Sequence, residues 1–130
     1  MHNGDDAYEK LRGRTKSYAS RMITLYAYLQ AHHHFNDAAL VIGKQLLRSG
    51  TSVAANHREA KYSRSVADRI AKFSIVLQEL EESGLWVELL IEHNMADAVA
   101  LHDLLNETDQ LTGIFAASIK RLRTRHEATG

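Results

Sequence analysis

The absence of proline is the feature that most restricts the folds open to this chain of 130 residues. Proline interrupts helices because it lacks a backbone donor, so a chain without it can form long unbroken helices. Strand signals are also missing: apolar and polar residues do not alternate cleanly, and no Asn-Gly or Asp-Gly separates two β-branched runs. Both observations predict an all-α protein.

Apolar residues recur at intervals of three and four, the spacing of one helical face, along four segments. We expect helices over about residues 12–33, 37–61, 64–93 and 95–125. The expected N-caps are Asn36, Ser63 and Asn94, the last with Asp97 at capping-box spacing. Phe35 is expected to pack on Leu40 as a hydrophobic staple. Short loops between four helices predict an antiparallel up-down-up-down four-helix bundle, a single domain over residues 1–130.

The segment LLRSGTSVAANHREA, residues 46–60, places Gly, Ser and Thr inside an expected helix. The apolar stripe passes through Gly50 without a change of phase, so we predict one continuous helix despite a glycine cost of ~1 kcal/mol. Two interpretations of Gly50 stay open. It either lets two helix backbones approach closely, or it exposes backbone and neighbouring hydroxyls to a ligand.

The formal net charge is zero, yet the expected topology separates the charges. One end of the bundle, here called the basic end, collects the start of the first and third helices and the end of the second and fourth. Six of the 16 acidic residues fall there, against fourteen of the 16 basic ones. Those basic residues are Lys10, Arg12, Arg14, Lys16, Arg21, Arg58, Lys61, Arg64, Arg69, Lys72, Lys120, Arg121, Arg123 and Arg125. Helix stability does not require this, since cations are unfavourable at helix N-termini.

Three explanations of the basic end stay open: chance clustering on solvated faces, a surface for polyanions, and attraction between unlike ends of neighbouring chains. For the second, the expected partner is RNA or DNA, contacted through its backbone, because no base-reading signature is present. The candidate nucleic-acid-binding residues are Arg58, Lys61, Arg64, Arg69, Lys72, Arg121, Arg123 and Arg125. The alternative function is a scaffold or protein-partner-binding bundle without a nucleic-acid role.

The segment LWVELLI, residues 85–91, has six apolar residues in seven. A helix in a small bundle needs an apolar stripe, and this segment is apolar nearly all round. Trp86 and Leu90 point away from Val87 and Ile91, so we expect them to need another surface. They are the candidate interface of a homo-oligomer.

No pattern for catalysis, metal binding or a cofactor is found in the sequence. Cysteine is absent, as are a nucleophile elbow, a P-loop and a dinucleotide fingerprint. His32, His33 and His34 point about 100° apart on a helix, so they are not expected to share a metal. His57 lies on the core stripe and is expected to be neutral and hydrogen-bonded. We therefore expect a non-enzymatic protein with no cofactor.

The chain is expected to lie in the cytoplasm and not in a membrane. Its N-terminal residues contain no apolar run typical of a secretory signal. No apolar stretch approaches the ~18–20 residues that a membrane-spanning helix needs.

Two segments, LLRSGTSVAANHREA and FSIVLQELEESGLWVELL, carry a resemblance to a known family. The matched residues are Arg48, Ser49, Gly50, Thr51, Ser52, Ala55, Asn56, Glu59, Ala60, Ser74, Leu77, Glu79, Trp86, Glu88, Leu89 and Leu90. The chain resembles the four-helix bundle proteins encoded in 23S rRNA intervening sequences over about residues 35–90. The resemblance implies a four-helix bundle and supplies no catalytic residue.

The chain is also similar to the accessory proteins of diversity-generating retroelements, which form pentameric rings and bind nucleic acid. That similarity implies a homopentamer with RNA or DNA as a partner. His57 departs from the family pattern, which usually has an apolar residue at this position.

Overall fold

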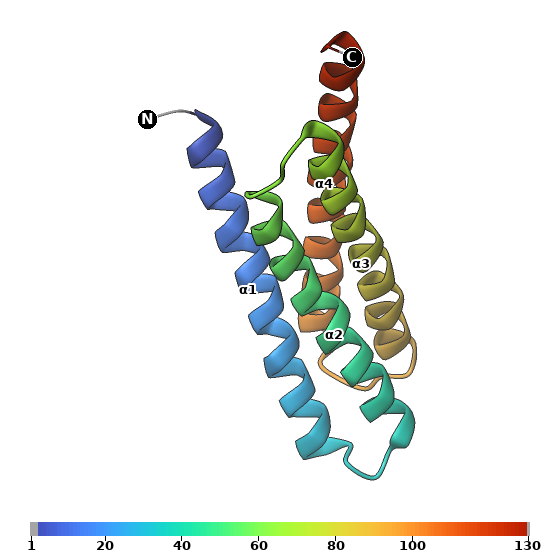
Figure 1. Ribbon diagram of the computed structural model, residues 1–130. Coiled ribbons are helices and arrows are strands. Elements are labelled where there is room, and N and C mark those ends of the chain that lie inside the picture. The colour runs from blue at the N-terminus through green and yellow to red at the C-terminus, as the bar shows by residue number, and fades with distance from the viewer. Residues whose placement is uncertain (1–2, 130) are drawn as a thin grey trace.

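The computed structural model describes residues 3–129, and all four elements are helices. Their bounds are α1 (Asn3–His32), α2 (Asp37–Ala60), α3 (Val66–Glu92) and α4 (Ala98–Thr129). The α1–α2 and α3–α4 loops lie at one end of the bundle, and the α2–α3 loop and both termini lie at the other (Figure 1). The predicted all-α, up-down-up-down bundle is therefore confirmed.

Close packing of backbones involves consecutive helices: α1 with α2, α2 with α3, and α3 with α4. Each helix buries one stripe of its surface, so the apolar face predicted from the spacing becomes the common core. The fully buried side chains with the largest volumes are Tyr18, Phe115, Met22, Leu29, Leu46, Leu80, Leu90, Leu101, Leu111, His57, Val53 and Val76.

Several polar side chains join helices α1 and α4. Arg14 on α1 makes two hydrogen bonds to the Glu107 carboxylate on α4, at 2.5 and 3.2 Å. Arg21 donates to Asp103 at 3.1 Å. Between these ion pairs, the Tyr18 hydroxyl lies 2.7 Å from the Thr108 hydroxyl in a fully buried contact.

The Tyr18 hydroxyl is expected to stabilise this seam by about 1 kcal/mol, the usual net value of a buried hydrogen bond. Tyr18→Phe should lower the free energy of unfolding by that amount, measured by urea denaturation. Tyr28→Phe is the matched control because Tyr28 is 40% exposed, and it should change stability by less than about 0.5 kcal/mol. Equal losses in both variants would contradict a stabilising role for the Tyr18–Thr108 contact.

The helix ends differ in detail from the sequence expectations. Helix α1 begins at Asn3, earlier than residue 12, because Tyr8 and Leu11 extend the inward face toward the N-terminus. Asn36 is confirmed as the N-cap of α2, accepting from the Ala39 amide at 3.1 Å. Phe35 is not a hydrophobic staple, since it is 92% exposed.

The other two predicted caps are wrong. Ser65, and not Ser63, caps α3, and its hydroxyl accepts from the Asp68 amide at 3.0 Å. Asp97 accepts from the Ala100 amide at the start of α4, whereas Asn94 has a φ of 52° just after α3. Asparagine tolerates this left-handed conformation, so its role is to end one helix, not to begin the next.

Among the helices that the structure describes, none is both long and apolar enough to cross a membrane.

Candidate nucleic-acid interface

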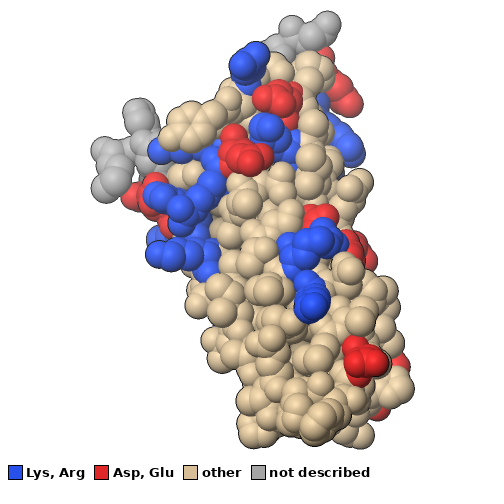
Figure 2. All heavy atoms as spheres, turned by 60° about the horizontal axis from the view of Figure 1, so that its bottom comes forward, with Lys and Arg blue, Asp and Glu red and all other residues tan. Residues whose placement is uncertain are grey.

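The topology gathers Lys and Arg at the end of the bundle where the chain begins and ends. Figure 2 shows Lys and Arg over the upper half of one face with Asp and Glu among them, and further Lys and Arg just below its middle. The charged residues toward its lower tip are Asp and Glu. The arrangement follows from helix direction alone, because the start of α1 and the end of α4 lie beside the α2–α3 loop. The charge separation expected from the sequence is present in outline, but Arg14 and Arg21, which are expected at the basic end, pair with Glu107 and Asp103, which are not expected there.

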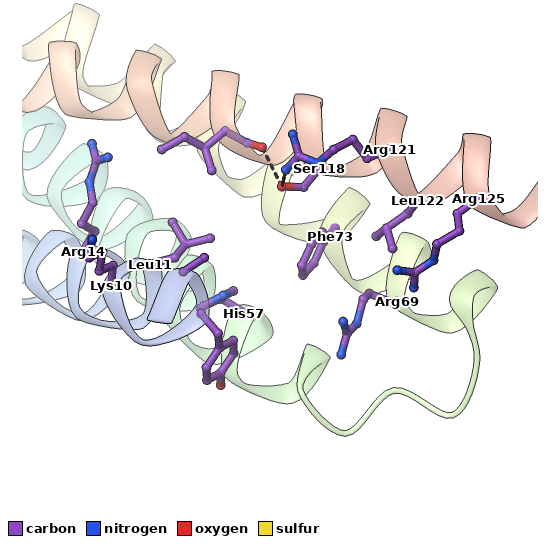
Figure 3. A pocket seen from close by; sticks show the side chains of 13 residues that line it. Lys10, Leu11, Arg14, His57, Arg69, Phe73, Ser118, Arg121, Leu122 and Arg125 are labelled. Atoms are coloured by element: carbon purple, nitrogen blue, oxygen red, sulfur yellow. Dashed lines mark hydrogen bonds between the residues drawn. The ribbon is translucent and has the colours of Figure 1, made fainter. Parts of the chain in front are cut away.

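A pocket of about 670 Å³ opens at the basic end between α1 and α4. Five cationic side chains line it, and none of the described lining residues is Asp or Glu. The five are Lys10, Arg14, Arg69, Arg121 and Arg125 (Figure 3). The pocket exists because α1 and α4 lack close backbone packing, so the seam between them stays open beyond the Arg14–Glu107 pair.

Arg14 and Arg121 are held by neighbours. The hydrogen bonds with Glu107 raise the pKa of Arg14 and fix its guanidinium at the inner edge of the pocket. Arg121 donates to the Ser118 hydroxyl at 3.2 Å, one turn earlier on α4 (Figure 3). A positioned cation loses less side-chain entropy when it binds an anion than a freely rotating one does.

The floor of the pocket is apolar and aromatic. Leu11, Phe73 and Leu122 lie among the cations in Figure 3, and His57 lies below them. The His57 ring is 5.0 Å from the Tyr8 ring and 6.3 Å from the Phe73 ring, between centroids. Three rings from three helices thus form a row along one wall.

His57 is 1% exposed and neutral at pH 7. Its pKa is lowered from 6.5 to about 4, chiefly by burial and then by the nearby charges of Arg12, Arg58 and Arg69. Its Nδ1 is buried without a hydrogen-bond partner among the described residues. The prediction of a neutral core histidine is confirmed, and the expected hydrogen bond is absent at Nδ1.

The eight predicted nucleic-acid-binding residues do not form one continuous site. Arg69, Arg121 and Arg125 line the pocket. Arg64 and Lys72 instead line a second depression of about 580 Å³, which also contains Glu59 and Asp68.

The remaining three candidates lie outside both depressions. Lys61 stands over the rings of Tyr8 and Tyr62, at 5.5 and 5.9 Å from their centroids. Arg58 and Arg123 are exposed. Lys10 and Arg14 also line the pocket but are not among the eight residues predicted to bind nucleic acid. Their spacing of four residues, which places them on one helical face, is a signal that could have identified them.

The segment around Gly50 forms a packing junction of three helices. A Cβ atom on Gly50 would overlap the Met22 side chain of α1, so glycine permits this close approach. Ser49 and Ser83 pair through buried hydroxyls 2.7 Å apart between α2 and α3. The close-packing interpretation of Gly50 is confirmed.

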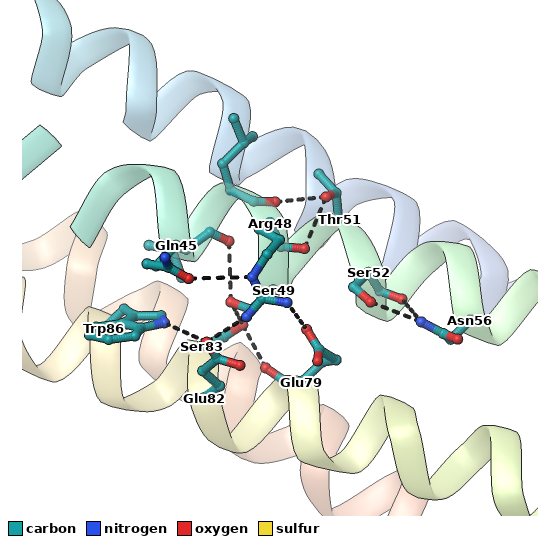
Figure 4. A network of polar contacts seen from close by, with 12 residues as sticks. Gln45, Arg48, Ser49, Thr51, Ser52, Asn56, Glu79, Glu82, Ser83 and Trp86 are labelled. Atoms are coloured by element: carbon teal, nitrogen blue, oxygen red, sulfur yellow. Dashed lines mark hydrogen bonds and ion pairs between the residues drawn. The ribbon is translucent and has the colours of Figure 1, made fainter. Parts of the chain in front are cut away.

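Arg48 completes the junction on its exposed side. It bonds to Glu79 at 3.1 Å and to Glu82 at 2.5 Å, and the Trp86 indole donates to the same Glu82 carboxylate at 3.4 Å (Figure 4). The hydrogen bond from Arg48 lowers the pKa of Glu82 and raises its own. This arginine is therefore engaged within the bundle, apart from the basic end.

Of the two predicted interface residues, Leu90 is wrongly placed, because it is fully buried in the core of its own chain. Helix α3 packs on both α2 and α4, so the face that it buries is wider than a single apolar stripe. Trp86 is half-buried, and Leu85 beside it is 48% exposed.

Within residues 3–129, no group of three or more His, Asp or Glu side chains is placed to hold a metal ion. Of the three consecutive histidines, His32 packs against the Tyr28 ring at 4.3 Å, and His34 packs against the Phe35 ring at 4.0 Å.

These features define a class of protein: a four-helix bundle fixed by a polar junction near its middle and carrying a cation-lined pocket at one end. The chain belongs to the family of 23S rRNA-intervening sequence proteins, whose profile matches residues 14–117. The match includes the junction but ends before Arg121 and Arg125, so family membership does not by itself account for the pocket.

A solved structure agrees with this assignment. It is a protein of unknown function from the S23 ribosomal protein family of Bacteroides thetaiotaomicron, with a TM-score of 0.77 and 33% sequence identity. The similarity covers 84% of this chain and 97% of that one. None of the curated proteins compared with the chain matches it.

Proposed function

We propose that this protein is a non-enzymatic, cytoplasmic oligomer that binds the backbone of RNA or DNA through its basic end. The observation that supports this most directly is the pocket with five cations and no acid among its described lining residues. Phosphate contacts from Lys and Arg provide most of the affinity of sequence-independent nucleic-acid binding. The acidic opposite end repels the same partner, so binding is confined to one end of the bundle.

Oligomerisation is the second part of the proposal. Leu85 and Ile75 on α3 are 48% and 42% exposed, and Trp86 beside Leu85 is half-buried. A cyclic assembly presents the same end of every subunit to the same face of the ring. A ring of five, as the resemblance to the retroelement accessory proteins implies, would place five basic ends on one face and raise the local density of positive charge.

The proposal is tested by measuring the binding of RNA and duplex DNA across a salt series. A backbone-directed complex weakens steeply as salt rises, with log K falling by about 0.9 per phosphate contact for each unit of log salt on a duplex. Reversing Arg64, Arg69 and Arg123 to Glu should abolish binding, because six units of charge change at the basic end while no core side chain is removed.

Two control variants separate charge from other effects. Changing the same three arginines to Lys keeps the charge and should keep most of the affinity. Lys44→Glu lies toward the acidic end and should change affinity little. Light scattering should show the same assembly for all three variants. Absence of binding by the unmodified protein at low salt would refute the nucleic-acid function and favour a scaffold or protein-binding role.

A further inference from the structure

We propose that the pocket between α1 and α4 receives one unpaired nucleotide, with its phosphate among the cations and its base against the aromatic wall. This inference rests on the proposed nucleic-acid function and narrows it. A strand with unpaired residues would bind in preference to a continuous duplex. The ligand chemistry is a phosphate ester that carries a flat heterocycle, supplied by a nucleic-acid strand or by a free mononucleotide.

Size supports a ligand larger than a phosphate ion. The pocket holds about 670 Å³, within the range of roughly 300–1,000 Å³ that is usual for small-molecule sites. A single phosphate would contact the cations at the edge and leave the apolar floor of Leu11, Phe73 and Leu122 uncovered. A duplex cannot fill the same space, because its bases are paired and stacked inside the helix.

The lining divides into two chemical parts that match the two parts of a nucleotide. The cations come from α1, α3 and α4, and the described lining includes no acid, although one of the cations, Arg14, is paired with Glu107 outside the lining. Tyr8 and Phe73, whose rings flank the buried His57, supply flat surfaces, and bases stack on such rings whatever their sequence. The edge-to-face contact of Phe73 with Phe115, at 5.3 Å, holds the Phe73 ring in place.

His57 gives the wall its polar group. Its ring is neutral at pH 7, so it contributes to the wall as a heterocycle and not as another cation. Its Nδ1 has no hydrogen-bond partner among the described residues, which is unusual for a buried polar atom. His57 is among the residues that line the pocket, so a base held there brings hydrogen-bonding groups close to this ring.

The first experiment titrates the full-length protein with adenosine 5′-monophosphate at low salt and follows binding by calorimetry and by the NMR signals of His57. We expect saturable binding and a shift of the His57 ring signals. Ribose 5-phosphate, which has the phosphate without the base, should bind at least about fivefold more weakly, since stacking on an aromatic side chain contributes about 1–3 kcal/mol per base. Equal affinity for the two compounds, or no saturation by about 10 mM of the nucleotide, would overturn the inference.

Three variants locate the binding. Arg121→Gln removes a pocket cation on an exposed side chain and should weaken nucleotide binding about tenfold, the usual loss for a charged hydrogen bond. Phe73→Leu removes the ring while keeping an apolar side chain. It should reduce the ratio of the affinity for the nucleotide to the affinity for ribose 5-phosphate. Lys44→Gln removes a cation outside the pocket and should leave nucleotide binding unchanged. If Arg121→Gln binds the nucleotide as well as Lys44→Gln does, the pocket is not the site.

The second experiment compares an RNA hairpin that has an unpaired loop with a fully paired duplex of equal charge. Preference for the hairpin that is lost in Phe73→Leu identifies a nucleic-acid strand as the source of the nucleotide. Equal binding of hairpin and duplex, with no saturation by the free nucleotide, refutes the pocket inference and leaves the backbone-binding function standing. Saturable nucleotide binding without any RNA or DNA binding refutes the proposed function and assigns the pocket to free nucleotides.

Discussion

Replacing Gly50 by leucine is expected to lower the free energy of unfolding by about 1–3 kcal/mol or more. A Cβ at this position already overlaps the Met22 side chain, and a leucine adds three further carbons inside a contact of three helices. Relief requires the Met22 side chain, or α1 with it, to move away from α2. Urea denaturation followed by circular dichroism measures the loss.

Gly13→Leu provides the matched control for this prediction. Gly13 lies within α1, and nothing lies within 4 Å of a Cβ atom built there. Leucine is a better helix former than glycine, so this variant should be neutral or more stable by up to about 1 kcal/mol. Similar unfolding midpoints for the Gly50 variant and the unmodified protein would show that α1 and α2 do not approach at Gly50 in solution.

His57 is expected to make the fold less stable as the pH falls from 6.5 toward 4. Burial holds the pKa of the folded histidine at about 4, against 6.5 for the unperturbed side chain. Between these values the unfolded chain takes up a proton that the folded chain does not, so unfolding becomes easier. The linkage relation limits the loss of unfolding free energy to about 3 kcal/mol. The full loss is reached below pH 4, and above pH 6.5 there is none.

His57→Leu should remove this pH dependence. The difference in unfolding free energy between the variant and the unmodified protein is measured at several pH values from 7 to 4. Other groups whose pKa changes on folding, such as Glu82 beside Arg48, act in both proteins and cancel in the difference. We expect the difference to grow in favour of the variant as the pH falls. Parallel stability curves would show that His57 is protonated as readily in the folded protein as in the unfolded one.

Much of the fold is determined by the sequence alone. The absence of proline and the recurrence of apolar residues at threes and fours predict four long helices, since only one face of each is suited to a core. Helix α4 buries residues that recur at threes and fours, namely Leu101, Leu104, Thr108, Leu111, Phe115, Ile119 and Leu122. The separation of charge also follows from the sequence, because short loops force neighbouring helices to run antiparallel.

Only the tertiary structure decides which residues act together. The pocket joins Lys10 and Arg14 to Arg121 and Arg125, and no local pattern connects residues so far apart in the chain. Leu90 is buried because α3 packs against two helices at once, a fact about neighbours that periodicity within one helix does not contain. Helix spacing shows which side of a helix faces inward, whereas the open seam between α1 and α4, and with it the candidate site, depends on how far apart the helices stand once all four have packed.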